Sequence, residues 1–287
     1  MSARSIVLIG GLDTGKTNFL ARLWEALRSG EGKLVALSPP GDIKYVEEAL
    51  AHLLQGEFAP RSDRNLAERR SDFTISVAPT REPEAGVEII VPDVTGELWK
   101  SAVETSEIPN EWMEQLKQSV GALLFVRVLS EENVAPLDWV TAKRLLSQTE
   151  VDDAEAEKIP TQVFLCELLR FLEHTLKPAA GWTLPRVAVV VTAWDLLDEG
   201  LSRAGPSSYL RAEYPLFAGR LKDTRKLDVR VFGVSVVGGD LGVDEAFRQR
   251  FFEGELKDAG YVISDAAPGP LEEHDITSPV AWLIHGS

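Results

Sequence analysis

The stretch Gly-Gly-Leu-Asp-Thr-Gly-Lys-Thr at residues 10–17 constrains the fold of this chain more than any other feature. It follows the apolar run Ser-Ile-Val-Leu-Ile, which is typical of a buried strand, and it precedes a segment with helical periodicity. The spacing matches Gly-x-x-x-x-Gly-Lys-Thr, the pattern of a loop that wraps around phosphate groups between a strand and a helix. The alternative is a structural glycine turn with Lys16 in solvent. Because both flanking elements are predicted, we favour the phosphate-binding loop.

Several groups of this loop can hold a polyphosphate. Gly10 and Gly15 lack a Cβ atom, so the backbone can curl until its N–H groups point inward. The N-terminus of the following helix adds partial positive charge at the same place. We expect Lys16 to reach the β- and γ-phosphates and the Thr17 hydroxyl to bind Mg²⁺. Nucleotide binding is therefore assigned to the loop and the residue after it: Gly10, Gly11, Leu12, Asp13, Thr14, Gly15, Lys16, Thr17 and Asn18.

A second phosphate-sensing motif is predicted at Asp93 and Gly96, after the apolar run Val-Glu-Ile-Ile-Val. An Asp at the carboxyl end of a strand beside the first strand can hold Mg²⁺, usually through water. Gly96 has no side chain, so its N–H can contact the γ-phosphate and the loop can rearrange when that phosphate leaves. Asp-x-x-Gly alone is more often a turn, but its position after a strand favours a switch.

The catalytic predictions concern the neighbourhood of the γ-phosphate. Glu97 follows the second motif and is expected to orient the attacking water, although its charge near the phosphate slows the unassisted reaction. The first switch should lie between residues 54 and 72, where Ser62 is the chosen catalytic and Mg²⁺-binding residue and Ser71 is the alternative. The same segment contains arginines that form either a solvated basic surface or the source of an internal arginine finger: Arg61, Arg64, Arg69 and Arg70.

A base-reading motif follows the strand predicted at 186–192. The sequence Thr-Ala-Trp-Asp places a carboxylate at Asp195, which can accept hydrogen bonds from N1–H and the 2-amino group of guanine. Adenine does not present this pair of donors, so the motif favours GTP over ATP. Trp194 is expected either to pack against the base or, preferably, to fill the core. Ser235, at the end of a later strand, is a weaker match for a contact to the guanine oxygen.

With these motifs the sequence resembles the Ras-like and translation-factor-like class of P-loop GTPases, whose base motif is Asn-Lys-x-Asp. Thr192 stands at the Asn position, as a known kind of replacement. Ala193 stands at the Lys position and departs from the motif. The segments Thr-Gln-Val-Phe-Leu-Cys-Glu-Leu-Leu-Arg-Phe-Leu and Ser-Pro-Val-Ala-Trp-Leu-Ile-His-Gly look like those of bacterial double-GTPase-type domains of conflict-system operons. The resemblance covers roughly residues 5–240. It implies a switch that binds GTP or GDP with Mg²⁺ and hydrolyses GTP slowly.

Apolar runs alternate with segments of helical periodicity, which predicts a three-layer α/β fold of the P-loop NTPase type. About six strands are expected, at 5–10, 72–79, 87–93, 120–128, 186–192 and 228–235. The strands at 72–79 and 87–93 lie too close for a crossover helix, so they should form an antiparallel hairpin at one edge of a mostly parallel sheet. Helices are expected at 16–30, 42–54, 111–119, 137–148, 160–177 and 242–253.

We expect residues 1–287 to form a single domain, with an acidic insertion loop near 148–158 and a C-terminal extension over 240–287. The formal net charge of −15 argues against nucleic-acid and anionic-membrane partners, which need clustered Lys and Arg. The apolar runs fall short of the about 20 residues that span a bilayer, and the start does not resemble a signal peptide. Cys166 is the single cysteine, so the chain cannot form an internal disulfide, and we expect its side chain to be buried in a helix. A reducing cytoplasm fits this composition.

Two other functions stay open at this point. Ala193 and Glu97 favour a pseudo-GTPase that binds nucleotide without turnover, and measured phosphate release separates it from an enzyme. A P-loop ATPase or small-molecule kinase would make Thr-Ala-Trp-Asp accidental and would prefer ATP. The expected protein partner is an effector or activating protein of unknown identity, and a nucleotide-dependent dimer or a larger complex is left open.

Overall fold

The computed structural model describes residues 2–40, 44–60, 73–84, 86–91, 96–134 and 159–286. The strands in these ranges are β1 (Ser2–Ile9), β2 (Leu34–Ala36), β3 (Phe73–Pro79), β4 (Val87–Val91), β5 (Ser119–Arg127), β6 (Arg186–Thr192), β7 (Asp228–Ser235), β8 (Tyr261–Ser264) and β9 (Leu271–Glu273). The helices are α1 (Lys16–Ser29), α2 (Lys44–Leu54), α3 (Gly96–Thr105), α4 (Asn110–Gln118), α6 (Thr161–Thr175), α7 (Glu199–Ala204), α8 (Pro206–Glu213), α9 (Pro215–Asp223), α10 (Glu245–Glu253) and α11 (Ser278–His285), with short 3-10 turns η1 (Trp194–Leu196) and η2 (Leu256–Asp258).

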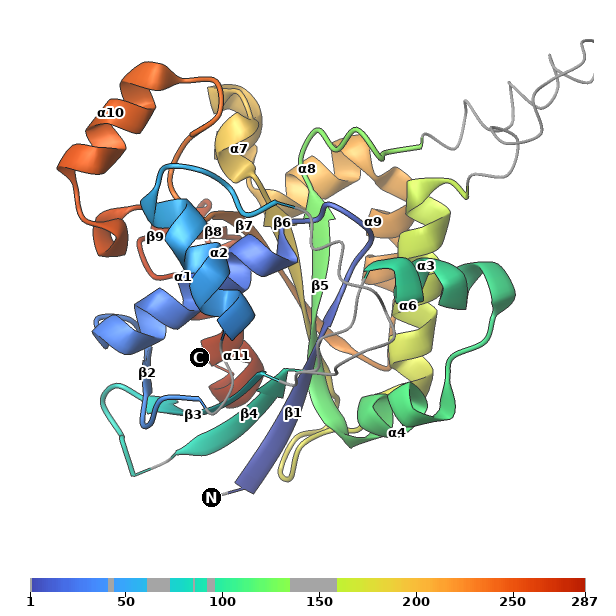
Figure 1. Ribbon diagram of the computed structural model, residues 1–287. Coiled ribbons are helices and arrows are strands. Elements are labelled where there is room, and N and C mark those ends of the chain that lie inside the picture. The colour runs from blue at the N-terminus through green and yellow to red at the C-terminus, as the bar shows by residue number, and fades with distance from the viewer. Residues whose placement is uncertain are drawn as a thin grey trace, which may run out of the picture.

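In the part of the chain that the structure describes, the strands form one nine-stranded sheet with helices on both faces, which confirms the predicted three-layer α/β class (Figure 1). The strand order is β2-β3-β4-β1-β5-β6-β7-β8-β9. The five central strands, β4, β1, β5, β6 and β7, run parallel to one another. Their carboxyl ends therefore share one edge of the sheet, where ligands bind in folds of this type.

The expected number of about six strands was too low. All six predicted strands are present, and β3 pairs with β4 in antiparallel fashion as predicted. The hairpin does not form the edge, because β2 pairs outside β3, and a second antiparallel set, β8 and β9, lies beyond β7. These three additional strands have only three or four residues each, which is too short for a periodicity signal.

Helix α1 follows the loop directly and confirms the helix predicted at 16–30. It buries Phe19, Leu23 and Leu27 on one face, as the helical spacing predicted. Gly30 ends it in the left-handed conformation with φ 70°, and its N–H donates to the Ala26 carbonyl oxygen. The first turn of α1 is therefore anchored by a packed helix body, which keeps its N-terminus aimed at the loop.

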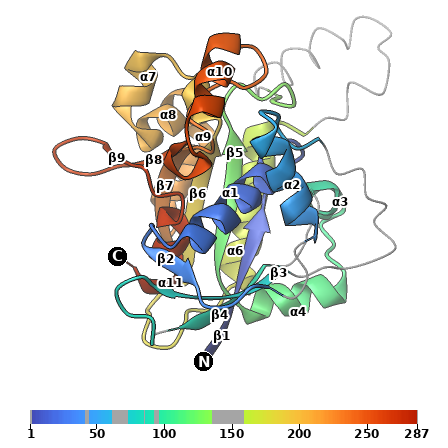
Figure 2. The ribbon, with the colours of Figure 1, turned by 60° about the vertical axis from the view of Figure 1, so that its left-hand side comes forward.

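Each face of the sheet has its own core. Alternate residues of the central strands point to opposite sides, so Val190 packs with α1, α2 and α11 while Val189 packs with α4, α6, α8 and α9. Figure 2 shows α1 and α2 side by side on the first of these faces. The segment from 261 to 285, which is part of the predicted C-terminal extension over 240–287, adds two strands to the same sheet and places α11 against β5 and β6.

Several elements were not anticipated from the sequence. Pro206 and Pro215 each open a new helix, so the region from 199 to 223 is divided into α7, α8 and α9, none long enough to show clear periodicity. The predicted helix at 137–148 and the acidic segment at 148–158 lie outside the described residues. The division of the chain into domains stays a prediction. In the described part of the chain, no helix combines the length and apolar character needed to cross a membrane.

The contact between Gly233 in β7 and the indole of Trp194 gives a stability prediction. A Cβ atom on Gly233 would lie 2.5 Å from Cδ2 of the buried indole. We therefore expect Gly233→Ala to lower the free energy of unfolding by about 1–3 kcal/mol through overpacking, measured by urea denaturation. The control is Gly219→Ala in α9, where an added Cβ meets no atom within 4 Å and a gain of about 0.5–1 kcal/mol is expected. A Gly233→Ala protein as stable as the parent would contradict the packing described here.

Candidate functional site

The loop between β1 and α1 is closely packed around the two glycines of its sequence motif, Gly10 and Gly15. A Cβ atom on Gly10 would lie 2.9 Å from Thr14 Oγ1 and 3.0 Å from the Phe125 backbone oxygen. Gly15 has a φ of 80°, and a Cβ there would lie 3.3 Å from Thr192 Oγ1. Glycine suits both positions, because one needs close approach and the other a left-handed backbone. The curled loop expected for phosphate binding is therefore imposed by packing against β5 and β6.

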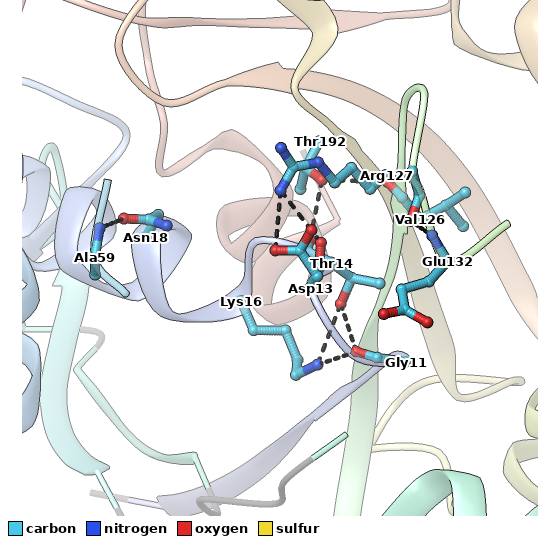
Figure 3. Close-up of polar contacts among 11 residues, drawn as sticks. Gly11, Asp13, Thr14, Lys16, Asn18, Ala59, Val126, Arg127, Glu132 and Thr192 are labelled. Atoms are coloured by element: carbon cyan, nitrogen blue, oxygen red, sulfur yellow. Dashed lines mark hydrogen bonds and ion pairs between the residues drawn. The ribbon is translucent and has the colours of Figure 1, made fainter. Parts of the chain in front are cut away.

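Lys16, the first residue of α1, turns back over the loop (Figure 3). Its Nζ donates hydrogen bonds to the Gly10 oxygen at 3.0 Å, the Gly11 oxygen at 2.7 Å and Thr14 Oγ1 at 3.1 Å. The Thr14 hydroxyl itself donates to the Gly11 oxygen at 3.0 Å. These contacts use the three N–H donors of the ammonium within the loop and hold its positive charge at the loop's mouth, where an anion would have to exchange for one of the oxygens to bind it.

Thr192 at the end of β6 holds the loop from the other side. Its side chain is buried, and Oγ1 donates to the Thr14 carbonyl oxygen at 3.0 Å, with the Val126 oxygen 3.4 Å away. A hydroxyl has one proton to donate, and here that proton is used within the protein. The sequence predicted Thr192 as a nucleotide contact; the structure gives it the additional task of tying the loop to the sheet.

Arg127, the last residue of β5, also reaches the loop. Its Nη1 lies 3.1 Å from Asp13 Oδ1 and 3.4 Å from the Asp13 carbonyl oxygen (Figure 3). Asp13 itself has a positive φ of 52°. Sequence analysis missed Arg127, since a single Arg in an apolar run matches no motif. The available signal was its place at the carboxyl end of the strand next to β1, where the polar ends of parallel strands converge.

A cavity of about 200 Å³ lies beside the loop and joins it to the base-reading motif. Its walls include Gly15 from the loop, Asn18 from α1, Phe58 from the segment after α2, and Asp195 after β6. The Asn18 side-chain oxygen accepts a hydrogen bond from the Ala59 N–H at 2.9 Å, which fixes that segment against α1. One continuous space therefore connects the phosphate loop with the predicted guanine-reading carboxylate.

Asp195 and Ser235, predicted from separate parts of the sequence, come together in this region. Burial raises the pKa of the Asp195 carboxyl, and the charge of Asp240 raises it further, while a hydrogen bond with Ser235 and the charge of Arg127 act in the opposite direction. Ser235 is buried, and its hydroxyl oxygen also accepts from the Gly238 N–H at 2.9 Å. The carboxylate is thus held in a partly apolar place, where hydrogen-bond donors of a ligand would stabilise its charged form.

Trp194 has to be corrected as a nucleotide contact. Its ring is fully buried, its Nε1 donates to Ser202 Oγ at 3.0 Å, and it packs edge-on against Tyr209 with ring centroids 5.6 Å apart. The indole belongs to the core, which was the preferred alternative, so its ring is not available to contact the base. Ala193 before it has a φ of 55° and contributes only a methyl group to the cavity wall.

The predicted Mg²⁺ ligands are only partly described. Thr17 lies half-buried in the first turn of α1, beside Lys16. Asp93, Ser62 and the arginine cluster of residues 61–70 lie outside the described residues, as does the side chain of Glu97. Gly96 is the first residue of α3. Hydroxyl and carboxylate oxygens are the ligands that Mg²⁺ prefers, so this donor set fits that ion. Within the described residues, no group of three or more His, Cys, Asp or Glu is placed to hold a metal.

A comparison with protein families decides the class to which this arrangement belongs. A family model described as Double-GTPase 1 matches residues 7–283. The chain belongs to the Double-GTPase 1 family. It is a P-loop GTPase of the double-GTPase type, as the loop, the switch motif and the base motif predicted. No curated protein matches this Double-GTPase 1 member.

Two solved structures show a more distant similarity. The chain is similar to the bacterial selenocysteine-specific elongation factor EF-Sec, with 13% identity and a TM-score of 0.38 over 88% of this chain and 29% of that one. It is also similar to the signal recognition particle receptor SRb in the SRb-GTP/SRX complex from Chaetomium thermophilum, with 16% identity and a TM-score of 0.39 over 88% of this chain and 98% of that one. This chain thus spans under a third of the elongation factor's length.

The Thr192 anchor predicts a coupled loss of stability and binding in this Double-GTPase 1 protein. Thr192→Val keeps the side-chain shape but leaves the Thr14 carbonyl without its donor, so we expect about 1 kcal/mol less stability in urea and weaker GDP binding by calorimetry. The matched control is Thr175→Val in α6, which removes a hydroxyl that donates to the Phe171 oxygen at 2.7 Å. That variant should lose stability alone. Unchanged GDP affinity in Thr192→Val would show that the anchor does not shape the loop.

Proposed function

We propose that this protein is a guanine-nucleotide switch, which binds GTP and GDP with Mg²⁺, hydrolyses GTP slowly and engages a partner protein according to the nucleotide bound. The observation that supports it most is the shared cavity, which has Gly15 of the phosphate loop in one wall and Asp195 in another. A nucleotide needs both a phosphate site and a base site at a fixed separation. Family membership supports the same function independently.

The phosphate site would be built from the loop and the start of α1. Lys16 is already held at the loop by the Gly10 and Gly11 oxygens, so it can meet the β- and γ-phosphates without being drawn from solvent. The backbone N–H groups of residues 11–17 and the N-terminus of α1 would bind the remaining oxygens. We assign Mg²⁺ to Thr17, Asp93 and Ser62; when bound, the ion neutralises charge on the β- and γ-phosphates.

The base site would depend on Asp195. Its carboxylate can accept from N1–H and the 2-amino group of guanine together, and the hydrogen bond with Ser235 helps to fix its position. We propose that Ser235 and the neighbouring backbone also face the guanine oxygen. Adenine would leave the partly buried carboxylate poorly paired, and that penalty supports discrimination against ATP.

Hydrolysis and switching would involve the start of α3. We propose that the Gly96 N–H contacts the γ-phosphate and that Glu97 orients the attacking water. Because Gly96 begins α3, loss of the phosphate would release the N-terminus of a helix and alter the surface it presents. The partner, by resemblance, is an effector or activating protein of a bacterial conflict or defence system in the cytoplasm. A module that binds nucleotide without turnover is the second candidate, because Ala193 departs from the family motif.

Nucleotide binding tests the function directly. GTP or GDP with Mg²⁺ at about 100 times its dissociation constant should add about 2.7 kcal/mol to the native state and raise the melting temperature, with ATP far less effective. Lys16→Ala should abolish this shift without unfolding the protein, because the hydrogen bonds of the ammonium to Gly10, Gly11 and Thr14 lie at the loop and not in the hydrophobic core. The control, Lys117→Ala, removes an exposed lysine of α4 that pairs with Glu114. Equal stabilisation by ATP and GTP would refute the guanine assignment, and absent phosphate release would favour the module without turnover.

The carboxylate of Asp195 predicts a change of base preference. Asp195→Asn should weaken GTP binding by about 1–3 kcal/mol, because an amide cannot accept from both guanine donors. XTP should gain part of that amount, since xanthine has a carbonyl where guanine has the 2-amino group. Competition binding with GTP, XTP and ATP measures the exchange. An unchanged ratio of GTP to XTP affinity would mean that Asp195 does not read the base.

The pH dependence of GDP binding provides a second test of the contact between Asp195 and guanine. The charged carboxylate is the form that accepts from guanine, and burial raises its pKa. Affinity for GDP should therefore decline as the pH falls through that raised pKa, at a higher pH than for an ordinary Asp. Without nucleotide the sign is opposite, because a raised folded pKa makes stability fall as the pH rises between the unfolded and folded values. Asp195→Asn should show neither effect, although Asp240 and Arg127 keep their charges nearby.

A further inference from the structure

The wall of the cavity carries an unfavourable charge for a nucleotide. Among the described residues that line it, the carboxylates of Asp13, Asp195 and Asp240 face one cation, Arg127. A nucleoside diphosphate or triphosphate is itself strongly anionic. Because like charges in a partly buried space repel strongly, a ligand of this class needs a compensating cation within the cavity as well as at the phosphates.

Arg127 is held where it can supply that charge. Its strand position is opposite Thr192 in the β5–β6 ladder, so it stands beside Ala193, the next residue along the chain. Two contacts to Asp13 fix the guanidinium against the loop at 3.1 and 3.4 Å. About a third of the side chain is exposed, so one side of the group remains open to a ligand.

The neighbouring Ala193 supplies no polar side-chain group to the same wall. The family motif has a Lys at this position, whereas here the side chain ends at Cβ. A planar guanidinium differs from an ammonium in that it can lie flat on an aromatic ring and donate from its edge at the same time. Arg127 therefore has both the position and the chemistry to replace the missing cation from an adjacent strand.

We propose that Arg127 is a specificity-determining residue of the base site, whose guanidinium lies against the guanosine moiety and takes the place of the cation absent at Ala193. The proposal rests on the guanine-nucleotide function proposed above. Asp13 positions the guanidinium, and the positive charge favours the ionised form of Asp195 that reads guanine. Arg127 thus interacts electrostatically with both the phosphate loop, through Asp13, and the base-reading carboxylate of Asp195.

A purely structural role predicts a different outcome. If Arg127 only pins the loop through Asp13, its loss disturbs every ligand of the loop equally. If it acts on the guanosine moiety, the loss depends on the presence of that moiety. Inorganic pyrophosphate with Mg²⁺ occupies a phosphate site without a base, so the comparison of GDP with pyrophosphate separates the two roles.

The experiment measures the dissociation constants of GDP, ADP and pyrophosphate by calorimetry on the full chain. Arg127→Ala should weaken GDP binding about tenfold, in the range of a partly desolvated cation–π or charge-assisted contact, and leave pyrophosphate binding unchanged. Arg127→Gln, which keeps length without charge, should behave in the same way, and Arg127→Lys should retain most of the affinity. The control Arg170→Ala removes an exposed arginine of α6 and should match the parent.

A rescue variant makes the test specific to the proposed replacement. Ala193→Lys in the Arg127→Ala background should restore GDP affinity to within about threefold of the parent, a residual of about 0.7 kcal/mol. Unchanged GDP binding in Arg127→Ala and Arg127→Gln, or an equal loss for GDP and pyrophosphate, would overturn the proposal. Failure of the parent itself to prefer GDP over ADP would instead remove the proposed function on which it rests. Circular dichroism confirms that each variant is folded.

Discussion

The hydrogen bond from the Thr192 hydroxyl to the Thr14 carbonyl, 3.0 Å long, connects the end of a central strand to the loop on which the whole site is built. The parallel strands β1, β5 and β6 end at the same edge, so a loop after β1 can be held by residues from the other two. Phe125 packs against Gly10, and Thr192 packs against Gly15. The conformation of the loop is consequently a property of the sheet rather than of the loop sequence alone.

Two positively charged side chains lie at the loop of a protein that is acidic as a whole. The chain has a formal net charge of −15, yet Lys16 and Arg127 both lie at the loop and both are held by oxygen atoms of it. A surface of this kind repels polyanions in general, while the positive charge of Lys16 and the backbone N–H groups of the loop can still attract a small anion. In the proposed function, recognition of phosphate therefore depends on the geometry of the loop and of Lys16 rather than on the overall charge of the protein.

The sequence predicted the loop, the six longer strands and α1 because each carries a strong local signal: glycine spacing, apolar runs or helical periodicity. It also predicted Asp195 and Ser235 as base-site residues, and the pairing of β6 with β7 brings these two residues close together. It could not place Arg127 at the site, because Arg127 reaches the loop only through the pairing of β5 with β1 and β6, which residues near it in the sequence do not reveal. Short strands such as β2 and helices divided by Pro206 and Pro215 fall below the length at which periodicity is informative.

The contacts that Lys16 makes to the Gly10 and Gly11 oxygens have a kinetic consequence. The three N–H donors of this ammonium are already used by Gly10, Gly11 and Thr14, so an arriving phosphate has to displace at least one of these contacts before Lys16 can bind it. When the phosphate leaves, the same oxygen atoms can accept from Lys16 again, so a change of partners at the ammonium accompanies both binding and release. A partner protein that stabilises the contacts of the ammonium with the loop would thereby accelerate the release of a bound phosphate.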